Sequence, residues 1–233
     1  MKKGIFAVLV VIALVIIGTL IVKGGKSEKT LEQSVQDQST VTDSSKMELA
    51  SGSFELDTET ATVQWEGRKT LIEGYVDRGT LSVQESELTA NEDGLSSGSI
   101  LFNMDSIKTV STGVGGGQAG LDKHLKSADF FDVAQFPTAT FEITGSEKTE
   151  VEHMYNVSGN LTMKGVTESV TIPMELFMSE NGLRLIATAN LDRTKWNVVY
   201  GSGSFFDNLA NNVIDDMFAI SFDLVAKEKV EVE

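Results

Sequence analysis

The sequence predicts an all-β domain with one short helix, preceded by an N-terminal transmembrane helix. Three observations lead to this fold class. From Phe54 onward, apolar residues recur at every second position, as in strands that bury one face. Turn-forming residues separate these segments, and only residues 117–131 have helical character. Near the N-terminus, a run of 19 residues (4–22) contains no charged side chain.

The uncharged run has the length of a membrane span. As a helix it would be about 28 Å long, close to the thickness of the hydrocarbon core of a bilayer. A cleaved secretory signal needs a shorter apolar core and a small-x-small cleavage site, and GTLIVKGGKSEK, which follows Ile17, offers no convincing one. A lipoprotein signal needs a cysteine, which the chain lacks. The sequence therefore favours an uncleaved membrane anchor over residues 1–23. Lysines flank the run on both sides, so charge alone does not orient it.

The segment after the run, residues 24–52, is predicted to be a flexible linker. It is rich in Ser, Thr, Gln, Lys and Glu and has few large apolar residues, so it cannot bury enough apolar surface to order itself. The folded domain is predicted to span residues 53–227, and a charged tail occupies residues 228–233. A domain of about 175 residues is large enough for one substantial core.

Strands are predicted wherever apolar and polar residues alternate. Each strand then presents an apolar set to the interior and a polar set to solvent. The predicted inward sets are Ala61, Val63, Trp65 and Gly67; Gly98, Ile100, Phe102 and Met104; Ala139, Phe141 and Ile143; Tyr155, Val157, Gly159, Leu161 and Met163; Leu183, Leu185, Ala187, Ala189 and Leu191; and Phe218, Ile220, Phe222 and Leu224.

Turns and breaks define how these strands connect. Residues 91–94 (NEDG) and 180–182 (ENG) have the composition of hairpin turns. One short helix is expected near residues 121–128. Pro173 interrupts an otherwise good strand, which indicates an edge position or a bulge. Strands at this spacing form either a sandwich with a filled interior or a barrel that can hold one ligand, and the alternation alone does not choose between them.

Composition excludes some partners and some chemistry. The net charge is −15, and residues 1–26 contain four lysines and no acidic residue, so the rest of the chain carries −19. A domain this acidic repels the phosphates of nucleic acids. The chain has no cysteine, hence no disulfide and no thiolate chemistry.

The sequence offers no catalytic or metal-binding set. Its two histidines, His124 and His153, are far apart, and His153 is expected to be a solvated turn residue. No G-x-S-x-G elbow is present. Residues 115–120 fit G-x-G-x-x-G, but the neighbouring strands are of the antiparallel type, so a flexible loop is favoured over a dinucleotide site. No enzyme activity, cofactor or metal is predicted.

Two segments carry a family resemblance. Residues 124–141 (HLKSADFFDVAQFPTATF) join a short polar helix, a Phe-Phe pair, a loop ending at Pro137 and the start of an alternating strand. Residues 155–174 contain the pattern G-x-L-T-x-x-G-V-T in a hairpin. Together they resemble the YceI-like family of bacterial lipid-binding proteins over about residues 53–227. The resemblance implies an extended antiparallel, lipocalin-like β-barrel and a domain exported to the cell envelope. The segment that begins at residues 192–196 (DRTKW) resembles a further element of the family. In it, Arg193 is expected to pair with a carboxylate near the barrel rim, and Trp196 to cover the lumen or core.

The resemblance also implies a function. The barrel would bind, sequester or carry a polyisoprenoid or other amphiphilic lipid, and the N-terminal helix would hold it at the membrane with the domain outside the cytoplasm. The alternative is a non-catalytic interaction module with a solid β core. Partners would be the lipid and the membrane but no nucleic acid, and a homodimer is left open. The residues predicted to line a lipid-binding lumen are Trp65, Ile100, Phe102, Phe141, Val157, Leu161, Ile172, Leu185, Phe218 and Phe222.

Overall fold

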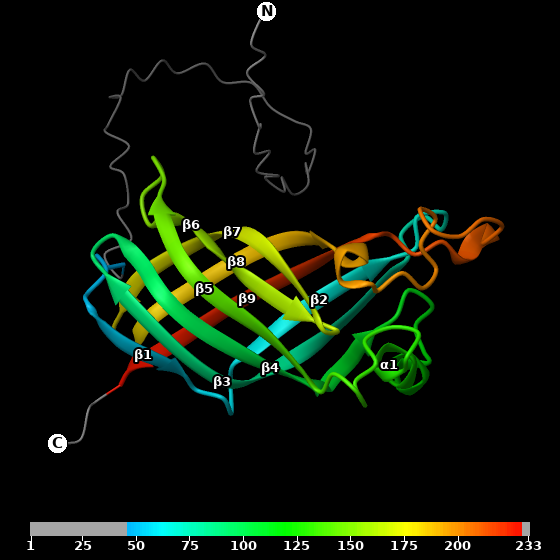
Figure 1. The fold of residues 1–233 in the computed structure, drawn as a ribbon, viewed down its shortest axis with the longest axis horizontal. Helices are drawn as coiled ribbons and strands as arrows, with labels where there is room; N and C mark the ends of the chain where they lie inside the picture. The colour runs from blue at the N-terminus through cyan, green and yellow to red at the C-terminus, as the bar shows by residue number, and fades with distance from the viewer. Residues whose placement is uncertain (1–45, 230–233) are drawn as a thin grey trace, which may run out of the picture. The chain divides into compact units, whose positions relative to one another are not determined.

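The computed structural model describes residues 46–229. The predicted all-β fold is confirmed for this part of the chain, which forms one antiparallel barrel with a short helix (Figure 1). Its elements are β1 (Gly52–Leu56), β2 (Thr62–Arg68), β3 (Val76–Asn91), β4 (Gly94–Ser111), α1 (Gln118–Lys126), β5 (Thr138–Lys148), β6 (Met154–Met163), β7 (Val166–Ser179), β8 (Gly182–Asp192), the 3-10 turns η1 (Arg193–Trp196) and η2 (Ala210–Asn212), and β9 (Met217–Glu228).

The barrel has eight strand positions, because β1 and β2 share one of them. Both pair with β3 on one side and with β9 on the other, at different heights along the barrel. In β1, Phe54 lies opposite Leu88 and Glu228, whereas in β2, Gln64 lies opposite Thr80 and Ser221. The remaining strands follow in chain order from β3 to β9, and every pairing between these strands is antiparallel. This closure selects the barrel over the sandwich that the alternation left open.

The turn predictions agree with the observed connections. Asn91 pairs with Gly94 where β3 turns into β4, and Ser179 pairs with Gly182 where β7 turns into β8. Pro173 pairs with Asn156 of β6, but the ladder between β7 and β8 begins only at Met174. A proline is tolerated here because, on the side of β7 that faces β8, no ladder hydrogen bond is needed at this position.

Helix α1 begins and ends slightly earlier than predicted. It runs from Gln118 to Lys126 rather than over 121–128. Gly117, with φ of 82°, turns the glycine-rich loop into the first helical residue. Ser127 is already extended, and both its N–H and its hydroxyl donate to the His124 carbonyl oxygen. The helix lies beside the end of the barrel formed by the ends of β2 and β4 (Figure 1).

The predicted N-terminal anchor (residues 1–23) and most of the predicted linker lie outside the described residues. Within residues 46–229, no helix is long and apolar enough to cross a membrane. Contacts with the barrel begin a few residues before the predicted domain boundary at 53. Met47 pairs with Met178 of β7, and the side chain of Leu49 is buried.

The interior differs between the two ends of the barrel. At the end with β1 and the β3–β4, β5–β6 and β7–β8 hairpins, side chains fill the space. Phe54, Leu88, Tyr155, Leu176 and Leu183 there have at most 1% of their surface exposed. We call this the closed end. At the other end, a second cluster joins α1 and the β8–β9 loop (residues 193–216) to the barrel wall.

Two interior glycines allow aromatic rings to lie flat against the wall. A Cβ on Gly79 would lie 2.0 Å from the Lys108 carbonyl oxygen and 2.3 Å from the Trp65 ring. A Cβ on Gly159 would lie 2.5 Å from the Phe141 ring. No other residue fits without displacing the ring or the backbone, so both aromatic side chains keep their positions along the interior.

Candidate functional site

The barrel contains an apolar cavity of about 440 Å³. It begins between α1, the β2–β3 loop (residues 69–75) and the β8–β9 loop, and extends toward the closed end. Its wall is formed mainly by inward-facing side chains of β2, β4, β5, β6, β7, β8 and β9. A barrel of about eight strands has room for one small ligand, and the volume lies within the range of about 300–1,000 Å³ typical of ligand pockets.

The structure places nine of the ten predicted lumen residues along this cavity. They come from seven strands and are brought together by barrel closure. They are Trp65, Ile100, Phe102, Phe141, Leu161, Ile172, Leu185, Phe218 and Phe222.

Val157 is the exception, because it does not line the cavity. Its side chain is fully buried, opposite Ile172 on β7, in the cluster that fills the closed end. The alternation of β6 correctly turns it inward. It does not indicate at which height along the barrel the interior changes from filled to hollow.

Residues outside the strands complete the mouth of the cavity. His124, from α1, and Tyr200, from the β8–β9 loop, line it, and their ring centroids lie 4.6 Å apart in an edge-to-face arrangement. Phe130 contacts both rings, with centroid distances of 4.9 and 5.3 Å. These contacts hold His124 at the mouth of the cavity. The Phe-Phe pair marked the segment in the sequence, but no periodic pattern indicated Tyr200.

Charged side chains that line the cavity gather at its mouth and have partners there. Glu66 accepts hydrogen bonds from Arg68 and from Arg78, whose Nε lies 2.8 Å from Oε2. The hydrogen bond from Arg68 is the largest cause of a lowered pKa at Glu66, which burial partly opposes. Lys69 lies over the Tyr75 ring, 5.1 Å from its centroid. These pairs form a polar rim around an apolar interior, an arrangement suited to an amphiphile rather than to acid–base chemistry.

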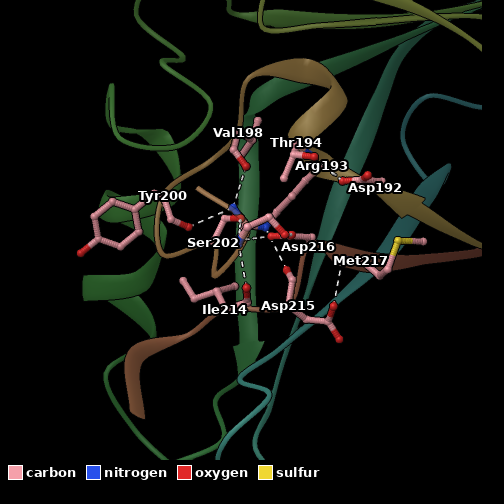
Figure 2. Close-up of polar contacts among 11 residues, drawn as sticks. Asp192, Arg193, Thr194, Val198, Tyr200, Ser202, Ile214, Asp215, Asp216 and Met217 are labelled. Carbon is pink, nitrogen blue, oxygen red and sulfur yellow. Dashed lines mark hydrogen bonds and ion pairs between the residues drawn. The ribbon is translucent and has the colours of Figure 1, made fainter. Parts of the chain in front are cut away.

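The buried guanidinium of Arg193 organises the β8–β9 loop (Figure 2). Nε donates to the Asp215 carbonyl oxygen at 2.9 Å, and Nη1 donates to those of Val198 and Tyr200 at 2.6 and 2.9 Å. Nη2 donates to the Ile214 carbonyl oxygen at 3.1 Å. One side chain thus fixes both arms of the loop, and with it the Tyr200 side of the cavity mouth.

Asp216 supplies the carboxylate that the sequence predicted for Arg193. Its Oδ1 lies 3.5 Å from Nη2 of Arg193, and its Oδ2 accepts a hydrogen bond from Ser204. Burial alone would raise the pKa of Asp216, but hydrogen bonds from Ser202 and Ser204 and the charge of Arg193 outweigh it, so that its pKa lies below the ordinary value of 3.8. Burial lowers the pKa of Arg193, and the neighbouring aspartates oppose that shift.

The lowered pKa of Asp216 predicts a stability term that acid removes. A carboxyl whose pKa is lower in the folded state stabilises the fold fully above its unfolded pKa, and this contribution disappears as the pH falls through the folded value. In urea denaturation, Asp216→Asn should therefore lower the free energy of unfolding at pH 7, and the difference from wild type should shrink below about pH 4. A difference that stays constant between pH 7 and pH 3 would contradict this assignment.

The structure corrects the expectation for His153 and makes the expectation for Trp196 more specific. His153 is 9% exposed and lies 6.0 Å from the Phe177 ring, so its expected place as a solvated turn residue is wrong. Its backbone, with φ of 59°, turns the side chain back onto β7. Trp196 packs in the core beside the cavity and donates to the Leu161 carbonyl oxygen at 2.9 Å. Within the described part of the chain, no cluster of three or more His, Asp or Glu side chains could hold a metal.

Similar sequences cover part of this chain. A protein named UPF0312 from Azotobacter vinelandii is 47% identical over 66 residues, which are 28% of this chain and 33% of that protein. Protein YceI from Salmonella arizonae is 36% identical over 98 residues, which are 42% of this chain and 44% of that protein. These alignments span less than half the length of either relative.

Solved structures with a similar fold match most of this chain. BcnA from Burkholderia cenocepacia matches 72% of this chain and 98% of its own with a TM-score of 0.56 and 20% identity. A polyisoprenoid binding domain from Saccharophagus degradans matches 76% of this chain and 98% of its own with a TM-score of 0.53 and 13% identity. At these identities the likeness concerns the fold. The sequence model of the YceI-like domain matches residues 54–226, most of the chain, and the chain therefore belongs to this family.

Proposed function

We propose that the barrel binds the apolar tail of an amphiphilic lipid in its cavity and sequesters or carries it. The observation that carries this proposal is an apolar cavity in line with the barrel axis, with a polar rim at one end only. The name of the Saccharophagus degradans domain, which shares the fold, supports a polyisoprenoid or a similar chain as the ligand.

Binding of this kind needs no chemistry. Each methylene moved from water into an apolar interior contributes about 0.8 kcal/mol, so a tail of ten or more carbons can bind tightly through burial alone. Polar groups at the mouth, such as Lys69 and Asn212, would face the head group of the ligand. Release then depends on the mouth rather than on a reaction, which suits sequestration or carriage.

The alternative, an interaction module with a solid β core, describes only the closed end. There the inward side chains fill the interior, as a solid core would. At the mouth end the same strands line a cavity. The lipid-binding function therefore accounts for the hollow half of the barrel, which the interaction module leaves without a role.

Native mass spectrometry of the purified full-length protein, followed by lipid extraction, tests the proposal. We expect a mass above that of the chain, and we expect the extract to contain an amphiphile with one or more apolar tails. Protein of the bare chain mass that also fails to take up any added amphiphile would refute the proposal.

We further propose that residues 1–23 anchor the protein in a membrane, with the barrel on the extracytoplasmic side. The support is the uncharged run of 19 residues, long enough to span a bilayer. An anchor would keep the barrel close to the source of its ligand. Detergent-free fractionation should recover the full-length protein with membranes, and recovery wholly in the soluble fraction would exclude the anchor. A homodimer stays a prediction, which light scattering can decide.

A further inference from the structure

The cavity ends well before the barrel does. Four inward side chains, Ile172 and Met174 of β7, Leu185 of β8 and Leu224 of β9, line its inner end and are each at most 5% exposed. We call these four residues the floor. One inward position further along the same strands, Leu176, Leu183 and Ala226 are fully buried and line no part of the cavity. The cavity is thus blind at this end.

The strands give the depth of the cavity. On β9, its lining extends from Met217 at the mouth to Leu224 in the floor, and on β4 from Ile107 to Ile100. Seven steps of about 3.3 Å cover about 23 Å along a strand. Barrel strands tilt by about 35–45° from the axis, so the depth along the axis is about 18 Å.

We propose that the floor limits the apolar tail of the ligand to about 14 carbons, or three to four isoprene units, with its head group held at the mouth. The estimate follows from chain geometry, because three backbone bonds span about 3.8 Å and one bond therefore advances about 1.3 Å. In a longer tail, the carbons nearest the head group must stay outside the mouth in water, where they gain nothing from burial. This inference rests on the proposed function and adds the class of ligand and the residues that select it.

Leu185 offers a direct test of the floor. Truncating it to alanine removes wall only at the inner end, so the space gained extends the cavity toward the closed end. Leu191, on the same strand, also lines the cavity but lies toward the mouth. Leu191→Ala removes the same atoms without changing the depth, which makes it a matched control.

The experiment offers an equimolar mixture of saturated fatty acids, C8 to C20, to full-length protein in nanodiscs and reads the bound species by native mass spectrometry. Dividing the occupancy of a variant by that of wild type at each chain length cancels the partition of the fatty acids into the bilayer. Wild type should favour chains near C14. Leu185→Ala should shift this preference by about two carbons to longer chains, whereas Leu191→Ala should leave it in place.

A variant that shortens the cavity guards against loss of folding. If Leu185→Ala does not fold, Leu185→Phe should shift the preference to shorter chains. Fatty acids bound by all proteins with an unchanged preference would overturn the role of the floor and leave the proposed function standing. No binding of any fatty acid, by wild type or variants, would overturn the proposed function and the floor with it.

Discussion

Replacing Leu161 by aspartate should abolish lipid binding while the barrel still folds. Leu161 lies near the C-terminal end of β6, opposite Phe141 of β5, and lines the cavity. Its side chain is partly exposed rather than fully buried, because one side faces the lumen. In the empty barrel, water in the cavity can hydrate the new carboxylate. A bound tail would have to displace that water and leave the charge in an apolar environment.

The expected loss of affinity is large. Burying an uncompensated charge costs several kcal/mol even after relaxation, and about 2.8 kcal/mol already corresponds to a 100-fold weaker complex. Native mass spectrometry and lipid extraction should therefore find the variant free of lipid. Circular dichroism should give the same β spectrum as wild type, and thermal unfolding should stay cooperative.

Thr162→Asp is the matched control for this variant. Thr162 is the next residue on β6, its side chain faces outward, and its hydroxyl lies 2.7 Å from that of Thr167. The same charge at the same height should leave lipid binding unchanged. A folded Leu161→Asp variant that retains lipid would contradict the binding role of this face. If both Leu161→Asp and Phe218→Asp unfold the domain, the interior acts as a solid core, and the interaction module takes precedence.

The sequence predicted the faces of the strands well because the alternation is a local property. Whether a side chain points inward depends on its own position in the pleated strand, and nine of the ten predicted lumen residues line the cavity. The height of a residue along the axis is not local. Val157 and Leu161 have the same periodic signal on β6, yet only Leu161 reaches the cavity, because β1 and three hairpins fill the interior around Val157.

Barrel closure could not be predicted from the alternation for the same reason. It depends on β1 and β2 sharing one position between β3 and β9, which joins residues near both ends of the domain. The family resemblance implied a closed barrel, but not that β1 and β2 share one position in it. The mouth was still harder to predict, since the β8–β9 loop has no periodic pattern, and Tyr200 lines the cavity from a part of this loop whose backbone is bound by Arg193.

Truncating Arg193 to alanine should give the largest loss of stability among single substitutions at the cavity mouth. The side chain is 4% exposed, and its guanidinium donates to four backbone carbonyl groups from both arms of the β8–β9 loop. Its removal leaves these acceptors and the carboxylate of Asp216 without their donor in a partly buried site. Breaking a buried pair in this way costs roughly 3–5 kcal/mol.

A second arginine serves as a control that separates the effect of burial on stability from the effect of charged hydrogen bonds. Arg184 also makes two charged hydrogen bonds, with Nε and Nη2 at 2.7 and 2.6 Å from the two carboxylate oxygens of Asp223, but both side chains are at least 40% exposed. Exposed ion pairs contribute about 0–1 kcal/mol, so Arg184→Ala should change the urea midpoint little. Equal losses in the two variants would contradict the organising role of Arg193. Arg193→Ala should also speed hydrogen exchange in residues 197–215 while β4 to β7 stay protected, because only the loop loses its fixed point and the barrel ladder stays intact.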